Sequence, residues 1–512
     1  MKNKELLLRA SLVATGAAMA FTGYAKSDDR PNIIYIMLDD MPYDMLPHGV
    51  RYPFLDMPNV ARLMREGVTF SNFFCINSLS APSRATNLTG TYSHINGQTQ
   101  NVGVLEPDWN KTPPFSVYMQ KSGYTTAFIG KIHMASDAAH QGKGAIRPGF
   151  DYWISIYGQG VYNDPLIVDN GVEVKTHGYV TDIFNQYALN WIAKGRDKSK
   201  PFVMCLWEKA VHAPNIPAEK YANLYEGETI PPPLYRTDQD DLSTKPKYQR
   251  VRSKGGTVTF PDSIEPAPWK PKDGQWGQLR TIASVDDSLG DILALLEKEG
   301  ILDNTIILFS SDNGFFHGEH QRGDKRLAYE NSMRIPMIVR YPKWVKGGST
   351  IDNVCLNLDV APTILDFAGI GKPSQMQGVS LKGLLQGQKY DNWRKSFLYE
   401  YYYDNGLATS RIPNLVAVRG ERYKYVDNDF LNNKDIDELY DLQNDPGEMR
   451  NLFLDKSSAT VLEQQRKELD SLKTEFKYNP DRNWRVYQLD PSFKDSRTDT
   501  GIKPAAKAKK KK

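Results

Sequence analysis

The chain of 512 residues is 40% hydrophobic and 24% charged, with a formal net charge of +3 at pH 7. This composition is typical of a large folded protein and excludes an intrinsically disordered chain. Six of the 64 basic residues lie in the last ten positions, so the rest of the chain carries 58 basic and 61 acidic side chains and gives no reason to expect nucleic-acid binding.

The N-terminal segment has the pattern of an export signal. Lys2, Lys4 and Arg9 precede the apolar run SLVATGAAMAF, and Gly23-Tyr24-Ala25 offers small residues at the cleavage positions. We therefore expect residues 1–25 to be a signal peptide and the mature protein to be periplasmic. The apolar run is too short for a membrane span, and no cysteine stands near the cleavage point to carry a lipid anchor.

Four apolar runs of strand length recur along the chain, and polar, titratable residues follow each of them. The runs are NIIYIML (32–38), TTAFIG (125–130), FVMCLW (202–207) and TIILFSS (305–311). Near-continuous hydrophobicity predicts strands that are buried on both faces, as in a parallel sheet covered by helices. Helical patterns alternate with these runs, at 60–67, 115–123, 182–195 and 284–300. The alternation predicts an α/β fold with a doubly wound, mostly parallel sheet.

The pattern changes after Cys355. A closing helix at 357–370 is followed by shorter alternating segments and a helix at 459–476, which predict a small antiparallel sheet with a helix packed on it. We expect three parts after the signal peptide: a large α/β domain (26–375), a smaller C-terminal α+β domain (376–495) and a basic disordered tail (496–512).

Two further features complete the organisation. Export permits disulfide bonds, but Cys75, Cys205 and Cys355 stand in scattered apolar contexts and are expected to be small core residues. The stretch 228–275 is rich in proline and charge, and we expect it to form a long loop over the site.

The strand ends carry a set of acids and bases. Ligands bind at the carboxyl ends of strands in such sheets, so these groups are expected to lie together: Asp39, Asp40, Lys131, His133, His212, Asp312 and Asn313. The acids and the amide are hard oxygen ligands that favour Ca²⁺ or Mg²⁺ over zinc, although paired acids can also cap helices. With Lys325, the lysines and histidines suit an ester whose oxygens carry negative charge, either a sulfate or a phosphate ester.

The stretch SAPSRATNLTG (80–90) predicts the start of a helix, with Pro82 in its first turn. A helix N-terminus is a natural anion site, which suits a nucleophilic Ser80. An ordinary N-cap is the commoner use of serine there, so the stretch alone leaves both interpretations open. His177, His317 and His320 are candidate substrate contacts, while His48, His94 and His140 are expected to be loop residues.

The same stretch resembles the sulfatase signature, in which Cys or Ser is followed by x-Pro-x-Arg and then Thr-Gly. Further motifs follow that family's order along nearly the whole mature chain: Asp39-Asp40, GKIHM (130–134), His-Ala-Pro (212–214), SSDNG (310–314), GDKRLAYENSMRIP (323–336) and ELYDLQNDPGEMRNL (438–452). The chain is thus identified as a member of the formylglycine-dependent sulfatases, of the bacterial Ser type. The resemblance implies an alkaline-phosphatase-like α/β domain, a small C-terminal sheet domain and one calcium ion.

The resemblance also implies roles for the residues. In this family the signature residue is oxidised to Cα-formylglycine, here from Ser80, and serine implies an oxygen-independent maturase that acts before export. One hydroxyl of the hydrated aldehyde attacks sulfur, and the second allows the aldehyde to reform and expel sulfate, which an unmodified serine cannot do.

By position, the calcium ligands would be Asp39, Asp40, Asp312 and Asn313 together with residue 80. Lys131 and Lys325 would bind sulfate oxygens, and Arg84 would orient the formylglycine. His133 would accept its proton, and His212 would protonate the leaving alcohol. The family's usual Trp-His-Leu-Gly after Gly-Lys is Ile-His-Met-Ala here.

The segment 150–182 resembles the insert of sulfatases that act on carbohydrates. Its Trp153, Tyr157 and Tyr162 are candidates for stacking on sugars, although core packing explains each equally well. A glycosaminoglycan sulfate, at the 4-O or 6-O position of N-acetylgalactosamine or N-acetylglucosamine, is the expected substrate. The alternatives are a phosphoesterase or phosphonate monoester hydrolase of the same superfamily, and a non-catalytic binder of sulfated glycans in which Ser80 stays unmodified.

Overall fold

The computed structural model describes residues 29–47, 49, 51–101, 106–134, 146–235, 242–250, 252–254, 257–259, 270–402, 412, 414–428 and 436–478. The predicted signal peptide and basic tail lie outside these residues, as do His48 and His140. Within them, no helix combines the length and the apolar character that a bilayer crossing requires.

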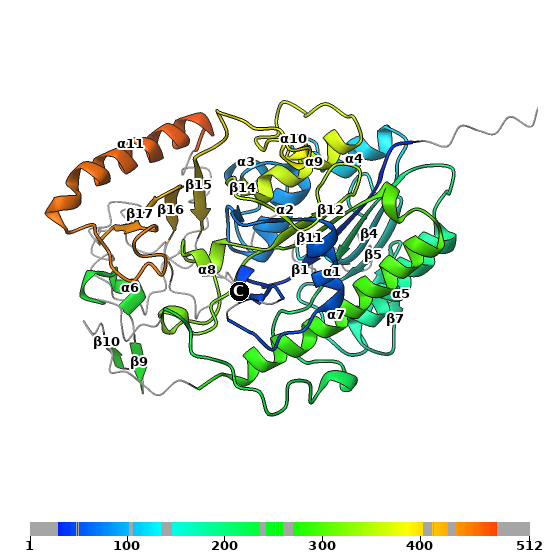
Figure 1. Cartoon of the computed structure of the whole chain (residues 1–512), viewed down its shortest axis with the longest axis horizontal. Helices are drawn as coiled ribbons and strands as arrows, with labels where there is room; N and C mark the ends of the chain where they lie inside the picture. Colours follow the sequence, from blue (N-terminus) through cyan, green and yellow to red (C-terminus); the bar gives the residue numbers. More distant parts are fainter. Residues whose placement is uncertain are drawn as a thin grey trace, which may run out of the picture.

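A ten-stranded sheet with the order β13-β2-β12-β11-β1-β8-β4-β5-β6-β7 forms the centre of the larger part of the molecule (Figure 1). The four runs predicted as strands are neighbours in its middle and run parallel: β11 (Thr305–Ser311), β1 (Asn32–Leu38), β8 (Phe202–Trp207) and β4 (Thr125–Lys131). This confirms the predicted doubly wound, mostly parallel sheet.

The segment 150–182, which includes the predicted insert, extends this sheet. Its strands are β5 (Tyr152–Ile156), parallel to β4, and the antiparallel strands β6 (Leu166–Asp169) and β7 (Val172–Lys175). Trp153 is fully buried and stacks on Phe128, with ring centroids 4.4 Å apart, and Tyr162 is buried against Tyr179. Core packing is therefore the correct interpretation of both, while Tyr157 is half-buried.

The opposite edge of the sheet is antiparallel at two of its steps. It consists of β12 (Met337–Arg340), β2 (Val68–Phe70) and β13 (Ser349–Ile351). A separate two-stranded parallel pair joins β3 (Phe73–Phe74) to β14 (Cys355–Leu356).

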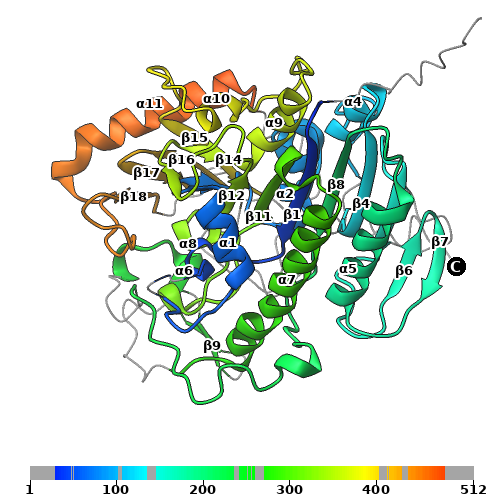
Figure 2. The ribbon, with the colours of Figure 1, turned by 45° about the vertical axis from the view of Figure 1, so that its right-hand side comes forward.

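Helices cover both faces of the sheet (Figure 2). On one face lie α1 (Pro58–Glu66), α5 (Val180–Asn190), which continues as a π-helical turn over Trp191–Gly195, and α7 (Asp273–Lys298). On the other lie α2 (Ser80–Thr89), α4 (Phe115–Lys121) and α9 (Val360–Phe367). The helix predicted from residue 284 begins at Asp273, so the preceding loop is shorter than expected.

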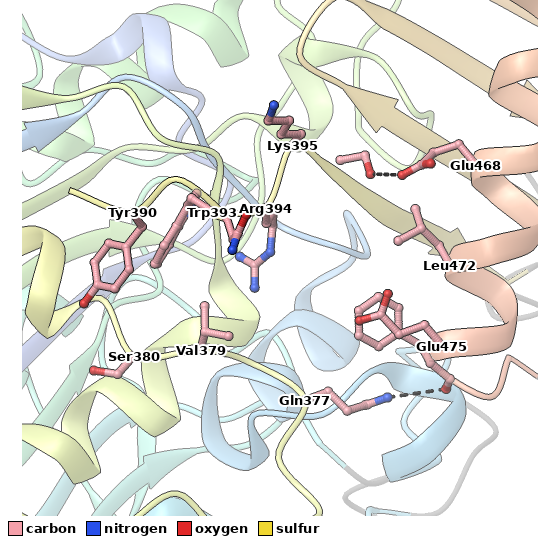
Figure 3. A pocket seen from close by; sticks show the side chains of 13 residues that line it. Gln377, Val379, Ser380, Tyr390, Trp393, Arg394, Lys395, Glu468, Leu472 and Glu475 are labelled. Carbon is pink, nitrogen blue, oxygen red and sulfur yellow. Dashed lines mark hydrogen bonds between the residues drawn. The ribbon is translucent and has the colours of Figure 1, made fainter. Parts of the chain in front are cut away.

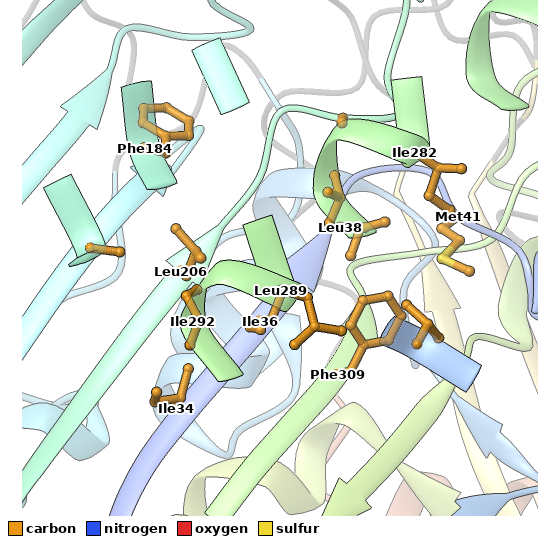
Figure 4. Packing of buried hydrophobic residues seen from close by; sticks show 14 of the residues in the cluster. Ile34, Ile36, Leu38, Met41, Phe184, Leu206, Ile282, Leu289, Ile292 and Phe309 are labelled. Carbon is orange, nitrogen blue, oxygen red and sulfur yellow. The ribbon is translucent and has the colours of Figure 1, made fainter. Parts of the chain in front are cut away.

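Strand β1 shows why its sequence is almost entirely apolar. Successive side chains of a strand point to opposite faces, so Ile34, Ile36 and Leu38 join the core under α5 and α7, as Figure 4 shows, while Ile33, Tyr35 and Met37 join the core under α2 and α9. The three cysteines are free and buried, as predicted.

A four-stranded antiparallel sheet forms the smaller part of the molecule. Its strands are β15 (Ser396–Tyr401), β16 (Leu415–Gly420), β17 (Tyr423–Asp427) and β18 (Glu438–Asp441), and α11 (Ala459–Glu475) packs against it through Leu469 and Leu472. This confirms the predicted small sheet and helix; the exact domain boundaries stay predictions.

Two expectations about loops need correction. The stretch 228–275 contains η6 (Leu242–Thr244), α6 (Lys247–Arg250) and a hairpin of β9 (Arg252–Lys254) and β10 (Thr257–Thr259). Its Lys245 is buried and donates to the Tyr440 hydroxyl at 2.7 Å, so part of this stretch packs on the small sheet.

His94, expected in a loop, lies in α3 (Ser93–Asn96) and is buried. Its Nδ1 is 2.7 Å from a Glu400 carboxylate oxygen and its Nε2 is 2.9 Å from the Phe476 carbonyl. The imidazole therefore connects α3 to β15 and to the end of α11.

The remaining elements are short. They are α8 (Glu330–Met333), α10 (Lys382–Leu385) and turns of 3-10 helix at Tyr43–Met45, Glu219–Tyr221, Leu302–Asn304, Glu319–Gln321, Asn357–Asp359 and Lys456–Ser458.

The core between β1 and α7 yields a first prediction. Ile36→Ala removes buried methylene groups beneath α7, where Leu289 and Phe309 line the same core, and should lower the free energy of unfolding by about 2–5 kcal/mol. Thermal unfolding followed by circular dichroism measures the change. The control is Leu454→Ala, because Leu454 is 60% exposed; equal midpoints for the two variants would contradict the packing described.

Candidate active site

The carboxyl ends of adjacent parallel strands bring two acidic pairs together. Asp39 and Asp40 follow β1, and Asp312 and Asn313 follow β11, its neighbour. The Asp40 N–H donates to Asp312 Oδ1 (3.1 Å), and Asn313 Nδ2 donates to Asp40 Oδ1 (2.7 Å). The pairs predicted from the sequence thus form one cluster, at the edge of the sheet where ligands bind in doubly wound folds.

Helix α2 brings Ser80 to this cluster as its first residue. The Ser80 hydroxyl donates to Asp39 Oδ1 (3.3 Å) and accepts from Lys325 Nζ (3.1 Å). The first turn is capped from elsewhere, because Asn101 Oδ1 accepts the Ala81 N–H at 2.9 Å. Ser80 does not serve as the N-cap, so its hydroxyl faces the acids and the lysine instead.

Arg84 lies one turn further along the buried helix and links three strand ends. Its Nε donates to Asp312 Oδ2 (3.0 Å), its Nη1 donates to the Lys131 carbonyl (2.6 Å), and its Nη2 lies 3.5 Å from Asp39 Oδ2. The guanidinium is fully buried. It is therefore the internal counterion of the acidic cluster.

Two buried lysines complete the charge balance. The Lys131 ammonium contacts the Asp39 carboxylate and the Gln159 amide oxygen, and the Lys325 ammonium contacts the Asp40 carboxylate. Burial lowers the pKa of Lys131. Burial has the same tendency at Lys325, but the charges of Asp40 and Asp39 outweigh it and raise the pKa of that lysine.

Two histidines border the cluster. His212 Nδ1 is 2.8 Å from the Ala213 carbonyl and donates to it, so Nε2 faces Asp40 Oδ2 at 3.7 Å. Burial and the nearby Lys131 charge lower the pKa of His212 to about 4. Burial also holds the pKa of His133 well below its usual range, and this residue has the left-handed φ of 56°. Both imidazoles are therefore neutral at pH 7 in this arrangement.

The donor set of the cluster fits a hard divalent cation. Burial opposes ionisation of Asp39, but the charges of Lys131 and Arg84 hold its pKa well below the usual range, whereas burial and the Asp39 charge raise the pKa of Asp312 to about 6. Asn313 Oδ1 is buried and accepts no hydrogen bond from any residue that the structure describes. Three carboxylates and one free amide oxygen are what Ca²⁺ prefers.

The three histidines predicted to contact substrate have their nearest partners outside this cluster. His177 is 93% exposed, and its ionic neighbour is Asp164 at 3.7 Å. His317 is buried, with Nδ1 2.7 Å from the Tyr52 hydroxyl and Nε2 against the Gln278 amide oxygen, so both ring nitrogens are engaged within the fold. His320 is buried against the Tyr329 ring, with centroids 4.3 Å apart.

Two residues of the site were missed from the sequence. Gln159 contacts Lys131 from the turn after β5. The one feature of the sequence that could have indicated it is the pair of glycines on either side, which is typical of a turn. Lys209 is buried after β8, where it donates to the Ala213 carbonyl (3.3 Å) and lies 4.7 Å from the Tyr162 ring centroid. For Lys209 the visible signal was a pair of charged residues, Glu208 and Lys209, directly after an apolar strand and shortly before His212.

A separate hollow of about 540 Å³ lies between residues 377–396 and α11 (Figure 3). Several polar groups on its wall already have partners inside the fold: Trp393 Nε1 donates to the Val354 carbonyl, Arg394 pairs with Asp359, and Ser396 donates to Glu468. None of its lining residues belongs to the cluster described above.

The cluster therefore combines a hydroxyl, hard oxygen donors, two ammonium groups and two neutral imidazoles. Ammonium groups and a divalent cation stabilise negative oxygens of a transferred group, and neutral imidazoles can exchange protons with it. This arrangement is chemically suited to hydrolysis of an anionic ester.

Comparisons with known proteins agree with this chemistry. The family model described as Sulfatase matches residues 31–370, and the model described as N-sulphoglucosamine sulphohydrolase, C-terminal, matches residues 318–475. An N-acetylglucosamine-6-O-sulfatase of Bacteroides thetaiotaomicron is 33% identical, and the similarity covers 88% of each chain.

Solved structures are also similar. A protein in complex with its substrate, D-glucosamine-2-N,6-O-disulfate, superposes with a TM-score of 0.76 at 31% identity, over 88% of this chain and 99% of that chain. A phosphonate monoester hydrolase of Agrobacterium radiobacter superposes with a TM-score of 0.70 at 21% identity, over 87% and 96% of the two chains. The second likeness concerns the fold alone.

The buried Arg84 gives a prediction about stability. Arg84→Gln leaves Asp312 and Asp39 without their shared counterion, and should lower the free energy of unfolding by about 3–5 kcal/mol. The control Arg62→Gln breaks more exposed pairs with Glu66 and Glu297 and should cost about 0–1 kcal/mol. Thermal unfolding of both variants measures the difference; a mild effect at Arg84 would contradict its role as counterion.

Proposed function

The chain belongs to the sulfatase family and is a sulfuric ester hydrolase with that family's alkaline-phosphatase-like fold, and from this premise we propose that it removes the 6-O-sulfate of N-acetylglucosamine or glucosamine units of glycosaminoglycans. The observation that carries the proposal is the placement of the Ser80 hydroxyl between Asp39 and Lys325.

The sugar assignment is supported by a sequence comparison and a structure comparison, both above 30% identity. The Bacteroides enzyme is an N-acetylglucosamine-6-O-sulfatase, and the similar solved structure holds a glucosamine with sulfates at its 2-N and 6-O positions. Both similarities extend over 88% of this chain. Both names have a 6-O-sulfate on a glucosamine ring in common. This narrows the substrate expected from the sequence, which was a 4-O- or 6-O-sulfate of either N-acetylhexosamine.

We also propose that Ser80 is converted to formylglycine by an oxygen-independent maturase and that Asp39, Asp40, Asp312 and Asn313 hold one calcium ion. The hydrated formylglycine would supply the attacking hydroxyl and a second hydroxyl for release of sulfate, and calcium would supply positive charge beside them. The buried Asn313 Oδ1, which accepts no hydrogen bond from the described residues, supports this proposal because it is free to bind the ion. The chain would act in the periplasm, as its N-terminal segment predicts.

The chain's own residues perform the remaining tasks. Lys131 and Lys325 offer N–H donors and positive charge to the sulfate oxygens, and Arg84 keeps the acids ionised and in place. His212 presents Nε2 toward the cluster, where it can protonate the leaving sugar oxygen; the negative ester raises the pKa of this histidine from its low value. His133 is the residue that we propose accepts the proton of the attacking hydroxyl.

The substrate proposal predicts a preference that enzyme assays can measure. Protein produced with an anaerobic maturase should desulfate N-acetylglucosamine 6-O-sulfate at least about tenfold more efficiently, in kcat/KM, than N-acetylgalactosamine 4-O-sulfate or an aryl phosphate. Ser80→Ala should abolish turnover.

Two other outcomes would contradict the proposal. A dominant rate on the aryl phosphate would indicate a phosphoesterase instead. The Ser80 peptide of the active protein should be about 2 Da lighter than its serine form; a fully unmodified peptide, together with tight binding of sulfated glycans, would indicate a non-catalytic binder.

The calcium proposal predicts a change in stability. Calcium at 100 times its dissociation constant should stabilise the protein by about 2.7 kcal/mol relative to chelator, since a ligand bound only to the folded state shifts unfolding by mass action. Asn313→Ala should reduce this stabilisation, and Asp287→Ala, on an exposed pair with Lys220, should not. Thermal melts with calcium and with chelator provide the measurement; identical melts of the parent protein would contradict the proposal.

A further inference from the structure

The Lys131 ammonium is held from two sides. Lys131 is the last residue of β4 and is fully buried, and its backbone carbonyl is fixed by Arg84. An ammonium has three N–H donors. In the described structure the Asp39 carboxylate and the Gln159 amide oxygen accept two of them, which leaves one for a bound anion.

A tight turn delivers Gln159 to this position. Strand β5 lies beside β4 with Ile156 opposite Lys131, so the residues after Ile156 begin at the level of the lysine. The turn is closed by the Gly160 N–H, which donates to the Tyr157 carbonyl at 2.9 Å. Gly158 and Gly160 have φ values of 49° and 60°, which glycine adopts readily. A Cβ on Gly160 would lie 2.4 Å from Ile156 Cδ1. The local sequence is therefore fitted to this turn.

The chemistry of the amide matters as much as its position. The carboxylate of Asp39 already offsets the charge of Lys131. A neutral amide oxygen can orient the ammonium without removing more of its positive charge, whereas a glutamate of the same size would compete with an anionic ligand for it. Burial strengthens this difference, because charges interact more strongly away from water.

We propose that Gln159 is a positioning residue of the sulfate site: its amide oxygen aims the Lys131 ammonium at the sulfate group and leaves the charge of that ammonium available to the substrate. The proposal rests on the proposed function, because it takes Lys131 as a ligand of sulfate.

Binding measurements in the Ser80→Ala background test it without any need for maturation. We would titrate this parent and its variants, in calcium-containing buffer, with glucosamine 6-O-sulfate and with inorganic sulfate by calorimetry. Gln159→Ala should weaken binding of the sulfated sugar about three- to tenfold, and Gln159→Glu should weaken it more than about tenfold. Val161→Ala, which changes a 54% exposed side chain two residues after Gln159, should bind as the parent does and control for changes in this segment.

A double-mutant cycle separates positioning from a purely structural role. If Gln159 acts through Lys131, Gln159→Ala should cost nothing further once Lys131→Ala is present. The proposal would be overturned if Gln159→Ala weakened binding equally with and without Lys131→Ala. It would also be overturned if the Gln159→Glu variant bound as tightly as the Gln159→Ala variant, because a purely structural role favours glutamate, which has the same size as glutamine.

The two probes distinguish failure of this inference from failure of the substrate assignment. A parent that binds inorganic sulfate but not glucosamine 6-O-sulfate would contradict the proposed substrate, and the order of the variants toward inorganic sulfate would still decide the role of Gln159. A parent that binds neither anion would overturn both.

Discussion

The mutual neutralisation of buried charges at one edge of the large sheet is the constraint on which the rest of the structure depends. Ionised groups removed from water are costly unless each has a partner. Asp39 and Asp40 are therefore stable only because Lys131, Lys325 and Arg84 surround them. Such a cluster contributes little net stability compared with an apolar core, so its presence indicates a site that binds and transforms an anion.

The fold follows from this requirement. Parallel strands place their carboxyl ends at one edge, and β11, β1, β8 and β4 are neighbours there, which collects groups that are far apart in sequence. Helix α2 adds Ser80 and Arg84 on one side, and the segment that follows β11 contributes Lys325. The groups of the cluster thus lie at one edge of a sheet that is packed on both faces.

The sequence was informative where the signal is local or belongs to a motif. Continuous apolar runs identified the four central strands, and the ordered motifs identified the acids, the lysines and Ser80. Signals that depend on distant packing were ambiguous or misread. For Trp153 and Tyr162 the sequence left sugar stacking and core packing equally open, and their contacts with Phe128 and Tyr179 decide for the core. His94 looks like a loop residue until Glu400 is placed against it. Gln159 depends on the register of two strands, which no short motif contains.

The complete burial of α2 sets an order of events. All ten residues of this helix, Ser80 included, are buried between the sheet and α9. The maturase proposed for Ser80 would have to reach this residue, and its burial in the finished helix prevents that. The proposed conversion would therefore act on the nascent or still extended chain, and a molecule that folds first would keep an unmodified serine at its centre.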